Sequence, residues 1–96
     1  MEQQNKKILI VEDDEFLRSL TAKRLESEGY AVKVAIDGQM ALDMLAEDKP
    51  DLILLDLLLP NLDGFELLEK MRAEDWGREL PVIVFSNLGQ KEDIER

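Results

Sequence analysis

The chain has 96 residues, which suffice for one small domain with a single hydrophobic core, and 45% of them are hydrophobic. Its 22 acidic and 12 basic side chains give a formal net charge of -10, and the sequence has no stripe of Lys and Arg that would indicate a nucleic-acid surface. The absence of cysteine and histidine excludes disulfides, thiolate metal sites and histidine-based catalysis, and leaves oxygen atoms as the available metal ligands.

The first predicted strand is the apolar run at residues 8–11, and four consecutive acidic residues end it abruptly. A helix is predicted to follow, with Asp14 capping its free amides and Gly29 stopping its far end. We expect the apolar side chains of this helix to be buried and its charged ones to be solvated: buried Phe16, Leu17, Leu20, Ala22 and Leu25, and solvated Arg18, Lys23, Arg24, Glu26 and Glu28.

Three more strands and two more helices are predicted along the rest of the chain. Alternation at residues 30–35 indicates a second strand, followed by a turn at Asp37-Gly38. The uninterrupted apolar run 52–55 indicates a central strand that ends at Asp56, and residues 82–85 a fourth, buried strand that stops at Ser86. Helical spacing of apolar residues predicts the two helices. The core positions of the first are Met40, Ala41, Met44 and Leu45. Those of the second are Phe65, Leu67, Leu68 and Met71, and this helix ends at Trp76-Gly77. Residues 91–96 are predicted to begin a further helix.

Strands that alternate with helices imply parallel pairing and right-handed crossovers, so residues 1–96 are expected to form one α/β domain with a doubly wound sheet. If the chain reverses its winding direction after the second strand, as flavodoxin-like sheets do, the strand order is 2-1-3-4. The first and third strands are then neighbours.

Oxygen-bearing side chains follow three of the four strands: Glu12 and Asp13 the first, Asp56 the third, and Ser86 the fourth. We expect them to converge in the crevice at the carboxyl ends of the first and third strands. Three carboxylates at that place repel one another by about 3 kcal/mol per close pair, and the cluster therefore favours a cation. Oxygen ligands without an EF-hand spacing indicate Mg2+.

The sequence contains no GxGxxG, no GxxxxGK[ST] and, without histidine, no Ser/His/Asp triad. These absences leave dinucleotide-binding, NTPase and hydrolase interpretations without a motif. Phosphoryl chemistry on a carboxylate remains, since an aspartate can attack phosphorus and become an aspartyl phosphate beside a magnesium ion.

Three stretches together resemble the receiver domains of two-component response regulators: Val11-Glu12-Asp13-Asp14, Leu55-Asp56-Leu57-Leu58-Leu59-Pro60 with Asp63-Gly64 behind it, and Val84-Phe85-Ser86. The resemblance implies that Asp56 is the phosphoacceptor and that Ser86 is the switch hydroxyl. It also implies that Mg2+ is held by Asp13 directly, by Glu12 through water, by Asp56 and by the backbone carbonyl of Leu58. The implied partner is a histidine kinase or a phosphotransfer protein, which docks on the first helix and on the loops around Asp56.

The largest departure from this family is that the 96 residues end before its fifth strand, which carries a lysine, and before its fifth helix. We therefore expect the fold and the metal site to be kept better than the signalling. The strand at residues 82–85 becomes a sheet edge with partly bare apolar side chains, so a homo-oligomer is expected, formed through that edge or by exchange of a terminal element.

Two alternatives from other classes remain beside a non-enzymatic signalling module. One is a binding or assembly module in which the acidic pocket is vestigial. The other is a Mg2+-dependent phosphatase with an aspartyl intermediate, although Leu58 occupies the place of the second aspartate that haloacid dehalogenase-like enzymes use as acid and base. Residues 1–7 lack an apolar signal region and no stretch is long enough to span a membrane, so a cytoplasmic protein without membrane contact is expected.

Overall fold

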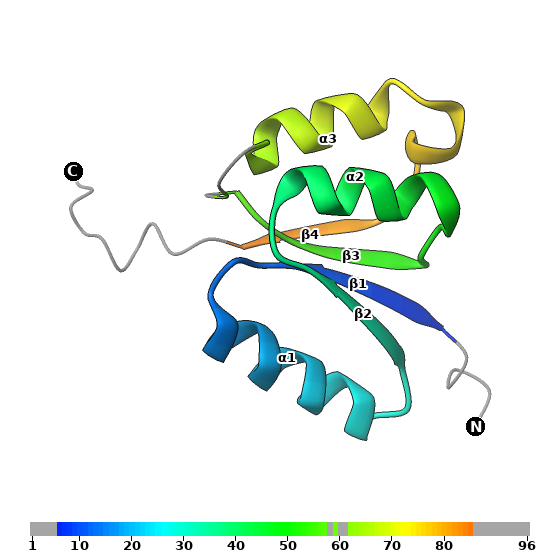
Figure 1. Ribbon diagram of the computed structural model, residues 1–96. Helices are drawn as coiled ribbons and strands as arrows, with labels where there is room; N and C mark the ends of the chain where they lie inside the picture. Colours follow the sequence, from blue (N-terminus) through cyan, green and yellow to red (C-terminus); the bar gives the residue numbers. More distant parts are fainter. Residues whose placement is uncertain (1–5, 58, 60–61, 86–96) are drawn as a thin grey trace.

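The computed structural model describes residues 6–57, 59 and 62–85 of the chain. Strands and helices alternate along it (Figure 1). Their order is β1 (Lys7–Val11), α1 (Glu15–Ser27), β2 (Ala31–Ala35), α2 (Gly38–Glu47), β3 (Leu52–Asp56), α3 (Gly64–Arg72), the short 3-10 helix η2 (Asp75–Gly77) and β4 (Val82–Phe85). Within these described ranges, no helix has the length and apolar character that crossing a membrane requires.

The four strands form one parallel sheet in the order β2-β1-β3-β4, which confirms the predicted flavodoxin-like topology. Helices α2 and α3 cover one face of this sheet and α1 covers the other (Figure 1). The register pairs Val11 at the end of β1 with Ala35 of β2 and with Leu55 of β3. The carboxyl ends of β1 and β3 are therefore adjacent.

The hydrophobic core lies between the sheet and the pair α2 and α3. Its largest fully buried aliphatic side chains come from β3 and from these two helices: Ile53, Leu55, Leu45, Leu67 and Met71. Each of these side chains loses nearly all of its contact with water, which stabilises the fold by roughly 1.5–3 kcal/mol per residue. The packing of the sheet against these two helices thus fixes the positions of the strand ends.

The other face of the sheet is less well covered, and here the sequence-based expectation was partly wrong. Helix α1 has no fully buried residue, and its Phe16 and Leu20 are 72% and 54% exposed. In β4, Ile83 and Val84 are 54% and 44% exposed, so this strand is not buried as a whole, although partly bare side chains were expected at its edge. Helical or strand periodicity identifies an apolar stripe, but burial depends on which neighbouring element meets that stripe.

Helices α2 and α3 begin in the same way, with an aspartate that caps the free amides of the first turn. The Asp37 carboxylate accepts a hydrogen bond from the Met40 amide at 2.8 Å, and the Asp63 carboxylate accepts one from the Glu66 amide at 2.9 Å. The turn predicted at Asp37-Gly38 is therefore the start of α2. A second difference in α2 is Met40, which was predicted to be a core residue and is 39% exposed.

The glycine after each cap permits a close approach of two backbones. A Cβ atom on Gly38 would lie 1.8 Å from the carbonyl oxygen of Leu62, and one on Gly64 would lie 2.7 Å from the carbonyl oxygen of Asp56. Neither overlap can be relieved without moving main chain. These two glycines therefore allow the segment that follows β3 to lie close against the first turns of α2 and α3.

Candidate metal site

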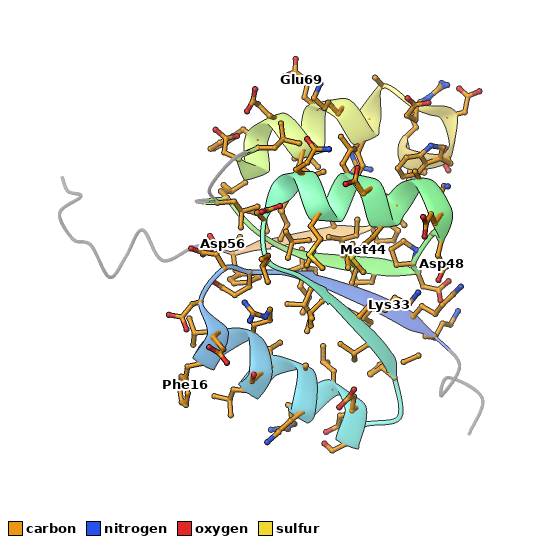
Figure 2. The ribbon with its side chains drawn as sticks, viewed as in Figure 1. Phe16, Lys33, Met44, Asp48, Asp56 and Glu69 are labelled. Carbon is orange, nitrogen blue, oxygen red and sulfur yellow. The ribbon has the colours of Figure 1, made fainter. Side chains whose placement is uncertain are left out.

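Three carboxylates meet at the carboxyl ends of β1 and β3. Glu12 and Asp13 directly follow β1, and Asp56 is the last residue of β3. One carboxylate oxygen from each of the three lies within 4.8 Å of the others, a spacing that suits ligands of a single metal ion. Figure 2 shows Asp56 at one end of the sheet, with Lys33 and Asp48 at the opposite end.

The three acids differ in burial. Glu12 is 1% exposed and Asp56 is 0% exposed, whereas Asp13 is exposed. The backbone N–H of Glu12 donates to the Ala35 carbonyl at 3.1 Å, and its Oε2 accepts from the Asp14 amide at 2.9 Å. Its Oε1 is buried with no hydrogen-bond partner among the described residues. A buried carboxylate oxygen in this state is costly, and a bound cation would satisfy it.

Burial raises the pKa of Glu12 from 4.5 to about 7. The hydrogen bond from the Asp14 backbone opposes this rise, while the negative charges of Asp56 and Asp13 and the closeness of the Asp56 side chain add to it. Near neutral pH the metal-free cluster can therefore hold a proton. A divalent cation would replace that proton and relieve the repulsion between the carboxylates.

The neighbouring acid, Asp14, has a different task. Its Oδ1 accepts a hydrogen bond from the Leu17 amide at 3.0 Å and caps α1, as the sequence predicted. Sequence reasoning missed Arg18, which was expected to be solvated but is half-buried. Its guanidinium donates to the main-chain oxygens of Glu12 and Asp13. A charged residue on a helix carries no local signal that separates such a contact from solvation.

Two predicted site residues, Leu58 and Ser86, lie outside the described residues. The described parts of the same segments are held near Asp56. The Leu57 amide donates to the Phe85 carbonyl at 3.3 Å, and the register pairs Asp56 with Phe85. The ends of β3 and β4 therefore lie side by side.

We expect Asp13→Ala to weaken Mg2+ binding and Asp14→Ala to leave it nearly unchanged, because Asp13 belongs to the carboxylate cluster and Asp14 caps α1. Loss of the cap is expected to lower the free energy of unfolding by about 1 kcal/mol. Thermal melts with and without Mg2+ separate the two effects. A magnesium-induced shift that persists in Asp13→Ala and vanishes in Asp14→Ala would contradict this assignment.

Comparison with known proteins identifies a family. The family model described as the response regulator receiver domain matches residues 8–96. The response regulator MprA of Mycolicibacterium vanbaalenii is 40% identical over 80 residues, an alignment that covers 83% of this chain and 34% of that protein. MprA of Mycobacterium tuberculosis strain H37Rv is 41% identical over 80 residues, with the same coverage of 83% and 34%. The chain spans about a third of the length of these curated relatives.

Solved structures agree with this result. The receiver domain of the Francisella response regulator 1452 has a TM-score of 0.80 and 32% identity, and the match covers 93% of this chain and 72% of that one. The bacteriophytochrome response regulator AtBRR has a TM-score of 0.79 and 34% identity, with coverage of 93% and 71%. In each case the shared part includes most of the sheet that carries the acidic cluster. This chain belongs to the response regulator receiver domain family.

Proposed function

We propose that the chain is a two-component receiver that accepts a phosphoryl group on Asp56 from a histidine kinase or a phosphotransfer protein, and switches conformation in response. The observation that carries this proposal is the cluster of Glu12, Asp13 and Asp56 at two adjacent strand ends of a receiver-family fold. Helix α1 begins beside this cluster and exposes Phe16 and Leu20, and we propose that the partner docks there and on the loops around Asp56.

The residues at the site fit a magnesium ion. The donor set is entirely carboxylate oxygen, which Mg2+ prefers, and the buried Glu12 Oε1 has no other partner among the described residues. We propose that Glu12, Asp13 and Asp56 hold the ion together with the backbone carbonyl of Leu58. When bound, Mg2+ neutralises charge on the phosphoryl group that is transferred.

Asp56 is the nucleophile of the chemical step. One oxygen of its carboxylate attacks the phosphorus of a phosphohistidine, an O–P bond forms, and the P–N bond breaks with its electron pair staying on the ring nitrogen. With its other ring nitrogen protonated, the histidine leaves as a neutral imidazole. Asp56 is the last residue of β3, and one of its carboxylate oxygens lies within 4.8 Å of those of Glu12 and Asp13, where the ion would be held. We propose that the hydroxyl of Ser86 then turns toward the phosphoryl group.

The test of this proposal is phosphorylation of the native chain by a small acyl phosphate. With Mg2+ present, intact-mass measurement is expected to show the gain of one phosphoryl group, and a chelator is expected to abolish it. The product should hydrolyse far more readily than a phosphoserine, because it is a mixed carboxylic-phosphoric anhydride. A chain that gains no phosphoryl group with Mg2+ would contradict the proposal and would favour a vestigial pocket.

We also propose that this 96-residue chain self-associates, through the edge of β4 or by exchange of a terminal element. In the described part of the chain β4 has a strand partner on one side only, and its Ile83 and Val84 are exposed. Sedimentation over a concentration series is expected to show a concentration-dependent increase in mass. A stable monomer at high micromolar concentration would contradict this.

The cytoplasmic location expected from the sequence stays a prediction.

A further inference from the structure

Arg18 connects α1 to the loop that carries two of the three clustered acids. Its Nη1 donates one hydrogen bond to the carbonyl oxygen of Glu12 at 3.0 Å and another to the carbonyl oxygen of Asp13 at 3.3 Å. Its own backbone N–H donates to the Asp14 carbonyl at 2.9 Å, within the first turn of α1. The side chain of Arg18 thus ties the helix back to two consecutive positions after β1, Glu12 and Asp13.

These hydrogen bonds go to main-chain oxygens of the loop, not to its carboxylates. The guanidinium therefore does not occupy either carboxylate, and Glu12 Oε1 and the Asp13 carboxylate remain available to a cation. Two further contacts hold the ends of this loop: the Glu12 amide donates to the Ala35 carbonyl of β2, and the Asp14 carboxylate accepts from the Leu17 amide of α1. Arg18 binds between these ends, at the carbonyl of the exposed Asp13.

We propose that Arg18 is a positioning residue for the metal site, which holds the backbone of Glu12 and Asp13 so that both carboxylates face Asp56. The inference rests on the proposed function, because it assigns Arg18 to the Mg2+ site of the receiver. Residues that orient metal ligands without touching the metal typically change its affinity 10–100-fold when they are replaced.

Charge and geometry act in opposite directions at this position, which makes the proposal testable. A guanidinium near the cluster repels an incoming cation, so removal of its charge alone would tighten Mg2+ binding. Removal of its two hydrogen bonds loosens the loop and weakens Mg2+ binding. Lysine keeps the charge, but its ammonium nitrogen is one bond closer to Cα than Nη1 is, and it lacks the planar donor fork of arginine. Methionine removes both the charge and the donors.

The experiment compares Arg18→Lys and Arg18→Met with the native chain by calorimetric titration with Mg2+ alone, at a temperature where thermal melts show each variant folded. Arg24→Lys and Arg24→Met are the matched controls, because Arg24 lies on the same helix and pairs with the exposed Glu28 at 3.2 Å. A second measurement is amide hydrogen exchange of the metal-free proteins at Asp14, whose N–H is bonded to Glu12. This exchange reports the order of the loop independently of any ion.

If Arg18 positions the loop, both Arg18 variants are expected to raise the dissociation constant for Mg2+ about 10-fold, and to speed exchange at Asp14, while the Arg24 variants change neither. Native affinity in Arg18→Lys, or equal or tighter binding in Arg18→Met, would overturn the proposal. A native chain that binds no Mg2+ would overturn the proposed function together with this inference. If the native chain binds Mg2+ and the Arg18 variants bind it with the same affinity, this inference alone would be overturned.

Discussion

Asp56→Asn is expected to abolish the phosphoryl gain that the native chain should show with a small acyl phosphate and Mg2+. The amide of asparagine has nearly the shape of the carboxylate, but it lacks the anionic oxygen that attacks phosphorus. Asp56 is fully buried at the end of β3, so a substitution of the same size is expected to keep the packing around it. The labelling rate should fall to background while the variant remains folded.

Asp51→Asn provides the matched control, because Asp51 lies just before the opposite end of the same strand and is exposed. Its carboxylate accepts a hydrogen bond from the Lys7 amide at 2.8 Å and belongs to no described acid cluster. This control should gain one phosphoryl group, as the native chain should, by intact-mass measurement. An equal gain in mass in Asp56→Asn and in the native chain would show that another residue is the phosphoacceptor.

The second large effect is on stability. The metal-free chain is expected to lose stability as the pH rises from about 4.5 to about 7, because burial raises the pKa of Glu12 to about 7 in the folded state. Below pH 4.5 both the folded and the unfolded chain hold this proton, and the contribution of Glu12 is fully present. Above pH 7 both have lost it, and the contribution is gone. The shift corresponds to about 3 kcal/mol in the free energy of unfolding.

Urea denaturation between pH 5 and pH 8, with a chelator present, measures this effect. Glu12→Gln is the control variant: it cannot titrate, so its stability should vary much less with pH. Mg2+ should restore stability to the native chain at pH 8, since the ion binds the ionised carboxylates. Asp48 does not interfere with this measurement, because hydrogen bonds from Lys7 and Lys33 lower its pKa and its titration lies at lower pH. An unchanged slope in Glu12→Gln would show that another group is responsible.

Local patterns in the sequence were enough to predict the elements and the ends of the strands. The apolar runs at residues 8–11 and 52–55 lie in β1 and β3, and Asp56 ends the second of them as expected. Asp14 is the cap of α1, and Gly29 follows that helix with a φ of 100°. These features depend on interactions between residues a few positions apart, so the sequence of each segment determines them.

Contacts between elements decided which of the side chains are buried and which partners they bind. Glu12 and Asp13 are adjacent in the sequence, yet one is buried with a raised pKa and the other is exposed, because β3 lies beside β1 and brings Asp56 against Glu12. Phe16 belongs to an apolar stripe but lies in solvent, and Arg18 belongs to a charged stripe but binds the loop after β1. Helical periodicity shows which residues share a face. Whether that face meets a strand, a loop or water depends on the packing of segments far apart in the chain, and that packing exists only in the folded domain.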